Sequence, residues 1–507
     1  MGTGILIIQR IFQFLSMVVH RIIALITHDN RLHKARFATT YELRQLLSSS
    51  VVSDGLLLGT RKGRDAVCVR PTKTRQELGN LLVVAPTRGG KGLLATSQLL
   101  SWNHSVVVND IKGDLFTQTA GYRATLGNVF VIDPTGIGHC FDPLAGKQTE
   151  DALYSASSHL LFEADETERI FTQRAIVMLT QLLLAARQEG MSPLVYVRFL
   201  IRLGLSDAAS RLNYLDPSLA TQFLDTTFSH ANLTDRFLLS CWGTLAARLR
   251  PLLTETVVRC FMRSDFSVEE VLRSDKPVTV YFRWKEQDLL ALSPLVRLLW
   301  GTLIHELTTA YDTYQGKDCH PVLLLIDEAG RTAIPMLADQ ATTVVGRGIS
   351  LWIAIQSLAQ LETVYGRARA QVLRDNMESQ IYYRPADQQT AKYLEDRLGT
   401  MSGFAYSTTS RDGEETSEGQ TERPIPLLAS QEIAQLSDEE IIGFHRHLPP
   451  MRLMRMDWRR HPTLSQRQSI PSPQLSALPQ LEDITLSSIQ SETVRYPHDY
   501  IDPDMVN

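Results

Sequence analysis

The chain has 507 residues, 44% of them hydrophobic, and a formal net charge of −4. These values exclude a disordered chain and allow two or three domains with a substantial core. The small negative charge gives no general attraction to nucleic acid, so any contact with DNA must come from local patches. The five cysteines are scattered and show no CxxC or Cys/His ligand spacing, which indicates a reducing compartment and no structural metal site.

The first element of the chain is an apolar stretch over residues 5–26. On a helical wheel its polar side chains form one narrow stripe with Arg10 and Arg21 at the border, which predicts an amphipathic helix. Two arginines make insertion across a membrane costly, and no signal-peptide cleavage site follows. We therefore expect residues 1–28 to lie in a membrane interface or to pack on a membrane partner. A soluble helix packed on its own domain is the alternative.

Residues 81–92 read LLVVAPTRGGKG, an apolar strand that runs into a glycine-rich turn and opens a helix. This is the layout of a phosphate-binding loop, in which backbone N–H groups surround an anion and Lys91 supplies a positive charge. The match to GxxxxGK followed by Ser or Thr is imperfect. Ala85 replaces the first glycine, and Gly92 replaces the hydroxyl residue that normally reaches Mg²⁺. The predicted phosphate-binding residues are Thr87, Arg88, Gly89, Gly90, Lys91 and Gly92.

A basic stretch precedes this loop, and it is either a solvated surface or a contact to DNA or another subunit. It comprises Arg61, Lys62, Arg64, Arg70, Lys73 and Arg75.

Short runs rich in Val, Ile and Leu recur along the chain, mostly separated by helical patterning. This alternation predicts an α/β fold with a doubly wound sheet. The predicted strands are residues 81–85, 105–109, 129–132, 278–282, 322–326, 351–355 and 379–383.

Between the third and fourth of these strands lies a long segment that has helical patterning and no strand signal. We predict that residues 150–263 form an all-α domain inserted into a discontinuous nucleotide-binding domain made of residues 29–149 and 264–462. Such an insertion explains why Lys91 and the next motif lie so far apart in sequence.

That next motif is VLLLIDE at residues 322–328, a run that suits a strand buried on both faces. Two carboxylates at its tip are useful beside a nucleotide. Asp327 is placed to hold Mg²⁺, and Glu328 to orient and deprotonate the attacking water. The alternative is that the pair caps the following helix.

The C-terminal third contains weaker signals. Residues 403–425 are polar and predict a mobile loop, and residues 451–458 predict an edge strand. The tail, residues 463–507, is rich in Ser, Gln and Pro, and we expect it to be largely disordered with a short partner-binding segment at residues 478–484.

Taken together, these motifs resemble the type IV secretion coupling proteins, the conjugative DNA-transfer ATPases, over residues 29–462. Several markers in the expected order are more specific than any one of them. They are ARFA at 35–38, APTRGGKG at 85–92, VVVNDIKGD at 106–114, LIDEA at 325–329, AIQSLAQL at 354–361, QIYY at 380–383 and RP at 423–424.

The resemblance implies a RecA-like P-loop domain with an inserted all-α domain, working with ATP and Mg²⁺ as a ring of six. Such a ring moves single-stranded DNA, usually with a covalently attached relaxase, toward the components of a type IV secretion channel. It implies a place at the cytoplasmic face of the bacterial inner membrane. A short form that exports effector proteins is also compatible with the sequence.

Carried onto this sequence, the resemblance assigns phosphate binding to Lys91, metal binding to Asp327 and the catalytic water to Glu328. Gln356, after the next strand, would sense the γ-phosphate, and Arg347 would be an arginine finger supplied to a neighbouring subunit. The alternatives are a strand-end turn residue and a surface arginine. The polar group Asp110, Lys112 and Asp114 lies near the nucleotide or faces the pore.

Most members of this family have two membrane-spanning helices, whereas this chain offers one amphipathic stretch, so docking on a separate membrane protein becomes plausible. The competing functional hypothesis is a receptor in which nucleotide only stabilises a docking platform. A third is the ATPase that powers assembly of the channel, against which the Lys-Gly loop ending and the short N-terminal region argue.

Overall fold

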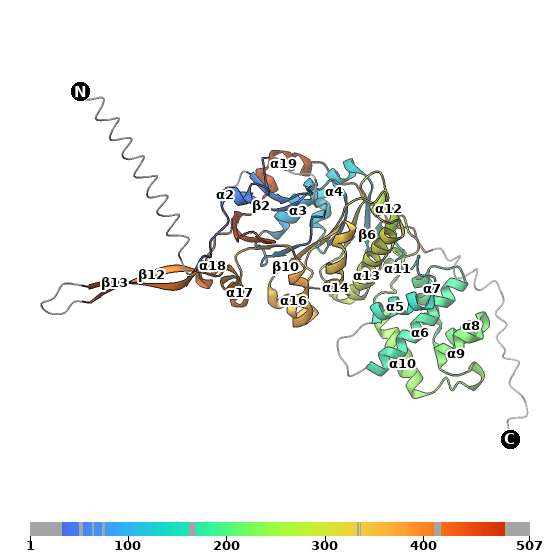
Figure 1. Ribbon diagram of the computed structural model, residues 1–507. Helices are drawn as coiled ribbons and strands as arrows, with labels where there is room; N and C mark the ends of the chain where they lie inside the picture. Colours follow the sequence, from blue (N-terminus) through green and yellow to red (C-terminus); the bar gives the residue numbers. More distant parts are fainter. Residues whose placement is uncertain are drawn as a thin grey trace, which may run out of the picture. The chain divides into compact units, whose positions relative to one another are not determined.

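The computed structural model describes most of the chain (Figure 1). The described residues are 33–49, 54–62, 65–72, 77–161, 169–331, 334, 336–409 and 417–481. The predicted helix at 5–26, three of the predicted basic residues (Arg64, Lys73 and Arg75) and residues 482–507 lie outside them.

The chain divides into two compact units. The first comprises Met1–His104, Pro321–Ala333 and Leu337–Ile470, and the second comprises Ser105–His320, Ile334–Met336 and Pro471–Asn507. Both units contain strands and helices, so the compact units do not coincide with the domain boundaries predicted from the sequence.

Four parallel strands follow five antiparallel ones in the sheet order of the first unit, which is β1-β3-β2-β15-β14-β11-β4-β10-β9. β11, β4, β10 and β9 are parallel, and their residues are buried and mostly apolar, because both faces of such a sheet are covered. Their carboxyl ends therefore meet at one edge. The bounds are β1 Leu47–Ser48, β2 Leu56–Arg61, β3 Asp65–Val69, β4 Leu81–Val84, β9 Val322–Ile326, β10 Ile349–Ile355, β11 Ser379–Tyr382, β14 Glu440–His445 and β15 Met451–Met454.

The strands of the second unit follow the order β5-β8-β6-β7. β5 (Ser105–Asp110), β8 (Thr279–Arg283) and β6 (Val129–Asp133) are parallel, and β7 (Ile137–Gly138) pairs antiparallel with β6. All seven strands predicted from the sequence are thereby confirmed, each to within two residues at either end.

Among the helices of the first unit, α3 begins within the predicted phosphate loop. The buried side chain of Gln98 fixes α3 to β2, because its carbonyl oxygen accepts from the Leu57 N–H (2.8 Å) and its amide donates to the Gly55 carbonyl (3.0 Å). The bounds are α2 Thr40–Leu43, α3 Lys91–Ser101, α14 Leu337–Thr343, η2 Val345–Arg347, α15 Leu358–Tyr365, α16 Arg367–Asp375, α17 Gln388–Leu398, α18 Ser430–Ala434, η3 Trp458–Arg460 and α19 Pro462–Gln468.

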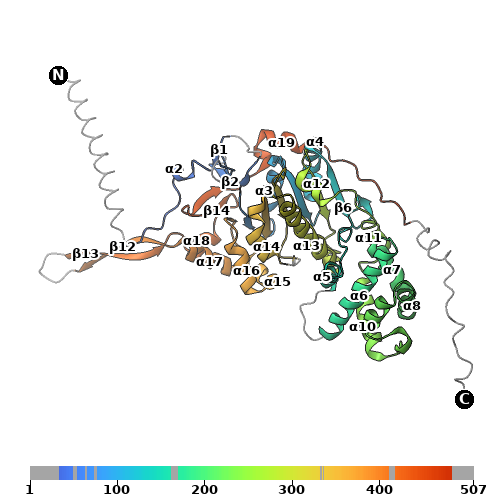
Figure 2. The ribbon, with the colours of Figure 1, turned by 45° about the vertical axis from the view of Figure 1, so that its right-hand side comes forward.

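Within the second unit, the described residues of the segment 150–263 contain helices and connections but no strand. α6 buries an apolar stripe against α5, α7, α9 and α10, which gives the helical group seen in Figure 2. That this segment is an inserted domain of its own stays a prediction. The bounds are α4 Asp114–Leu126, α5 Glu150–Leu161, α6 Arg169–Gln188, α7 Pro193–Leu203, α8 Leu205–Leu215, α9 Pro217–Leu224, η1 Phe228–His230, α10 Arg236–Leu249, α11 Glu255–Arg259, α12 Val268–Arg273 and α13 Leu289–Thr313.

The loop predicted at residues 403–425 is wrong. β12 (Thr400–Thr409) and β13 (Ser417–Pro426) pair antiparallel as a two-stranded ribbon, visible in Figures 1 and 2. A ribbon outside the main sheet needs no alternating apolar residues, so its polar sequence gave no strand signal. At its base Lys34 forms a bridge with Met401.

The strand predicted at residues 451–458 is present as β15, but it is not an edge strand. It lies between β14 and β2, and neither of these two strands was predicted from the sequence. The alternation of apolar and basic residues in β15 suits an edge strand and an interior strand equally. Only the strands that pair with β15 determine its position in the sheet.

The prediction of a largely disordered tail is wrong for residues 463–481. Leu464, on α19, is buried. Further on, Ala477 forms a bridge with Ile137, and Leu478 is buried with its N–H bonded to the Gly136 carbonyl (2.8 Å). Leu478, the first residue of the segment predicted to bind a partner, therefore contacts its own chain.

Candidate nucleotide-binding site

The loop between β4 and α3 (residues 85–92, the phosphate loop) needs both of its central glycines. A Cβ on Gly89 would lie 2.9 Å from the Pro86 carbonyl oxygen, and Gly90 has φ 105°, a left-handed value that favours glycine. Gly90 is the N-cap of α3, and no described side chain caps the helix there. The first N–H groups of α3 are therefore available to an anion.

Lys91, the first residue of α3, meets both carboxylates that follow β9. Its Nζ forms an ion pair with Glu328 and lies 3.4 Å from Asp327 Oδ1. The lysine side chain is 13% exposed. Fold topology thus brings together two motifs that are more than 230 residues apart in sequence.

Gln356, which follows β10, completes this cluster. Its Nε2 donates to Glu328 Oε2 (2.9 Å), and its Oε1 accepts from Thr87 Oγ1 in the phosphate loop (3.2 Å). The side chain of Gln360 holds the Gln356 backbone N–H (3.0 Å). A continuous chain of hydrogen bonds therefore runs from Thr87 through Gln356 and Glu328 to Lys91.

Glu328 is held as a carboxylate in a buried position. Burial opposes its ionisation, but the charge of Lys91 and hydrogen bonds from Lys91 and Gln356 outweigh burial, so the pKa of Glu328 is lowered. Its φ of 60° is unusual for a residue other than glycine. Such backbone strain is common where a side chain must be aimed at one point.

The oxygen donors beside Lys91 fit Mg²⁺, which prefers carboxylate, phosphate and water ligands. Asp327 is the carboxylate nearest to the lysine after Glu328. Gly92 offers no hydroxyl, and a Cβ built there meets no described atom within 4 Å. The metal role of Asp327 stays a prediction that is consistent with these donors.

Arg347 lies elsewhere. It belongs to η2, just before β10, whereas Gln356 follows the other end of that strand. Seven strand residues separate the two ends, on the order of 23 Å at the usual rise. Its Nη1 donates to the Thr343 carbonyl (3.0 Å). Arg347 is therefore remote from the phosphate loop of its own chain.

Two residues that lie against the phosphate loop have no role assigned to them from the sequence. A Cβ on Gly90 would be 3.3 Å from Arg455 Nη1 and 3.5 Å from Tyr383 Cε1. Tyr383 was noticed only as part of a family marker, and Arg455 only as part of the predicted edge strand. Nothing in the local pattern indicates that the residues after β11 and β15 lie beside Gly90.

A second turn with a lysine follows β5 in the second unit, at residues 110–113. The carboxylate of Asp110 accepts from the N–H groups of Gly113 and Phe116, both at 2.8 Å, and so caps α4 from within. Asp110 is buried, which gives it a structural role that the sequence did not predict. Lys112 and Asp114 are exposed.

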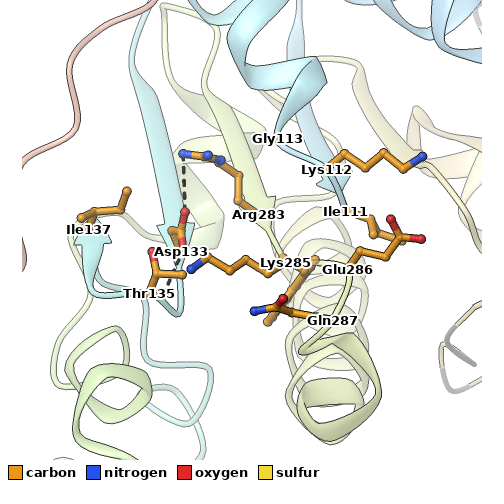
Figure 3. A pocket seen from close by; sticks show the side chains of 11 residues that line it. Ile111, Lys112, Gly113, Asp133, Thr135, Ile137, Arg283, Lys285, Glu286 and Gln287 are labelled. Atoms are coloured by element: carbon orange, nitrogen blue, oxygen red, sulfur yellow. Dashed lines mark hydrogen bonds and ion pairs between the residues drawn. The ribbon is translucent and has the colours of Figure 1, made fainter.

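This second turn borders a cavity of about 840 Å³. Figure 3 shows Arg283 pointing to Asp133, with which it forms an ion pair at 3.4 Å. Lys285 extends toward the same side as Asp133, whereas Lys112 extends away from it. The cavity is lined by Ile111, Lys112, Gly113, Asp133, Thr135, Ile137, Arg283, Trp284, Lys285, Glu286 and Gln287.

Part of the predicted basic stretch is structural. Arg70 Nη2 donates to the carbonyls of Gln45 (3.0 Å) and Leu47 (3.2 Å), which ties β3 to the chain before and within β1.

Across the described ranges, no helix is long and apolar enough to cross a membrane.

Residues 44–482 match the family described as type IV secretory system conjugative DNA transfer. The chain belongs to this family. Protein VirD4 of Rhizobium radiobacter is 25% identical to it over 438 residues, which cover 83% of this chain and 62% of VirD4. The chain thus spans less than two thirds of the length of VirD4.

Solved structures of the coupling protein TrwB share the fold. The unbound form of TrwBdeltaN70 has a TM-score of 0.62 at 17% identity, covering 85% of this chain and 95% of that one. TrwB in complex with ADP and Mg²⁺ has a TM-score of 0.58 at 17% identity, covering 84% and 97%. The predicted α/β RecA-like P-loop fold is confirmed.

Proposed function

We propose that this chain is an ATP-driven coupling protein of a type IV secretion or conjugation system. It recruits single-stranded DNA with its relaxase, or a protein effector, and delivers the substrate to the secretion channel. The observation that carries the proposal is the chain of contacts Thr87, Gln356, Glu328 and Lys91, within a member of the conjugative DNA transfer family. The TrwB complex with ADP and Mg²⁺ supports the choice of ligands.

The contacts suggest how the residues work. Phosphate oxygens bound at the start of α3 compete with Glu328 for Lys91, because the lysine is the only ion-pair partner of Glu328 among the described residues. Glu328 then accepts a proton from a water that Gln356 also holds. Asp327 would hold Mg²⁺, which would neutralise part of the phosphate charge.

Arg347 acts on a neighbouring subunit in this proposal. Its place at the amino end of β10 leaves it far from the phosphate loop of its own chain. A finger supplied in trans makes hydrolysis depend on a ring of subunits, six in the family, and contributes about 10³-fold or more to the rate.

Membrane attachment is assigned to residues 1–28, at the cytoplasmic face of the inner membrane. Deleting these residues should move the protein from the membrane fraction to the soluble fraction. Unchanged fractionation would overturn this part of the proposal.

The main test is ATP turnover by the wild type, Lys91→Ala and Glu328→Gln, with and without single-stranded DNA. Both variants should lose turnover, while Glu328→Gln still binds ATP, and DNA should stimulate only the wild type. Equal activity of all three proteins would contradict the motor. Nucleotide binding without turnover in the wild type would instead favour the nucleotide-stabilised receptor.

A further inference from the structure

The phosphate loop has two sides, and the catalytic candidates occupy only one of them. In the strand order β15-β14-β11-β4-β10-β9, the loop follows β4, while Glu328 and Gln356 follow β9 and β10. On the other side lie Tyr383, directly after β11, and Arg455, directly after β15. Tyr383 and Arg455 therefore face the part of a bound nucleotide that points away from Glu328.

Arg455 reaches the loop itself. Its Nη1 lies 3.3 Å and its Cδ 3.6 Å from the position of a Cβ on Gly90, the N-cap of α3. The backbone of Arg455 is fixed, because its N–H donates to the Glu439 carbonyl (2.7 Å). The guanidinium thus stands beside helix N–H groups that no described side chain caps.

Nearby carboxylates do not satisfy Arg455. Glu439 forms an ion pair with Arg460, and Asp457 forms one with Arg459 (2.6 Å). Arg455 itself has no ion pair within 4.0 Å among the described residues, and its Nε is buried without a hydrogen-bond partner there. A half-buried guanidinium in this state is ready to bind an anion.

Tyr383 is a second residue that favours an anion-binding site on this side of the loop. Its backbone N–H donates to the Val84 carbonyl (2.9 Å), which fixes the residue at the start of the phosphate loop. Its ring is almost fully buried next to Gly90, and its hydroxyl has no described hydrogen-bond partner. The buried Tyr383 and the half-buried Arg455 thus lie next to the same glycine, and each has a buried polar atom without a described hydrogen-bond partner.

We propose that Arg455 is a nucleotide-binding residue that contacts the phosphate groups shared by ADP and ATP, from the same chain that supplies Lys91. The proposal rests on the proposed function. Hydrolysis requires the γ-phosphate to face Glu328 and Gln356, so the α- and β-phosphates are left for the opposite side of Gly90. Arg455 and Arg347 then have different tasks: Arg455 binds nucleotide in cis, and Arg347 acts in trans on the transferred phosphate.

Calorimetric titration of ADP and of a non-hydrolysable ATP analogue, both with Mg²⁺, tests the proposal on the full chain. Arg455→Ala should weaken the binding of both nucleotides by the same factor, about 10- to 100-fold for a charge-assisted hydrogen bond. Arg455→Lys, which keeps the charge, should recover part of the affinity.

Arg452→Ala is the matched control, because Arg452 lies on β15, which Arg455 follows directly, is exposed and pairs with Glu440 (2.9 Å). It should bind both nucleotides like the wild type. Wild-type affinity in Arg455→Ala would overturn the inference, as would a loss confined to the ATP analogue or a loss that Arg452→Ala shares.

The proposed function fails in a different way. It fails if the wild type binds neither nucleotide, or if Lys91→Ala binds and hydrolyses ATP normally. If the wild type is active, Lys91→Ala is inactive and Arg455→Ala binds both nucleotides normally, only the role of Arg455 is overturned. A lower melting temperature of Arg455→Ala with unchanged affinity would likewise assign Arg455 a structural role alone.

Discussion

Two turns of this protein share one layout, the phosphate loop after β4 and the second turn after β5. Each follows a buried parallel strand, ends in a left-handed glycine and begins a helix, with φ 105° at Gly90 and 77° at Gly113. Each also has a lysine next to that glycine, Lys91 in one and Lys112 in the other.

The two turns differ in what occupies the N–H groups at the start of the following helix. Asp110 bonds two N–H groups of the second turn. Arg283 covers that turn from outside, with Nη2 2.9 Å from the position of a Cβ on Gly113. At the phosphate loop the N-cap is Gly90, which has no side chain that could cap α3. One acidic side chain therefore separates a helix end that is already satisfied from one that is open to a phosphate, although both have the glycine and the lysine.

The largest expected effect concerns the two lysines. Lys91→Ala should lower ATP turnover by about 10²-fold or more, because it removes a charge that stabilises the transferred phosphate. Lys112→Ala should stay within about twofold of the wild type when turnover is measured without DNA. Similar losses in both variants would mean that both turns serve the nucleotide.

The next effect is on stability. Asp110→Ala should lower the free energy of unfolding by about 1 to 3 kcal/mol, because two buried N–H groups at the start of α4 lose their acceptor. Urea denaturation measures this, with Asp114→Asn as the control at no more than about 0.5 kcal/mol. If Asp110→Ala instead gained affinity for inorganic phosphate without losing stability, the two turns would be equivalent after all.

A smaller effect should depend on pH. The folded-state pKa of Glu328 lies below its ordinary value, so its pairing stabilises the fold above the unfolded pKa, about 4.3, and is lost as pH falls through the folded value. Glu328→Gln should therefore destabilise the protein by about 1 kcal/mol at pH 7 and progressively less below about pH 4. Thermal unfolding between pH 3.5 and 7 follows the difference, and a gap that widens in acid would contradict it.

The smallest effect is expected at Gly92. The site has space for a side chain, so Gly92→Ser should be tolerated and should stabilise α3 by about 0.5 kcal/mol. Its hydroxyl would restore the usual Mg²⁺ contact of such loops, so the Mg²⁺ concentration needed for half-maximal turnover should fall or stay constant. A clear rise would show that the loop is built around the missing side chain.

Local patterns were sufficient for the parallel strands, because a strand buried on both faces must be a run of apolar residues, as Val322 to Ile326 illustrate. They failed for the ribbon β12 and β13, whose polar residues need no core. They also failed for residues 463–481, where burial of Leu464 and Leu478 depends on surfaces far away in sequence.

The amino-acid sequence by itself determined the glycine turn, Lys91, the Asp327-Glu328 pair and the family, because backbone conformation and phosphate chemistry restrict those residue types locally. Only the tertiary structure decided which groups meet. In the folded chain Gln356 donates a hydrogen bond to Glu328, Asp110 caps the helix that follows it, and Arg455 lies beside Gly90. The order of the strands in the sheet determines which side chains meet. That order depends on pairing between segments whose own sequences do not indicate their partners.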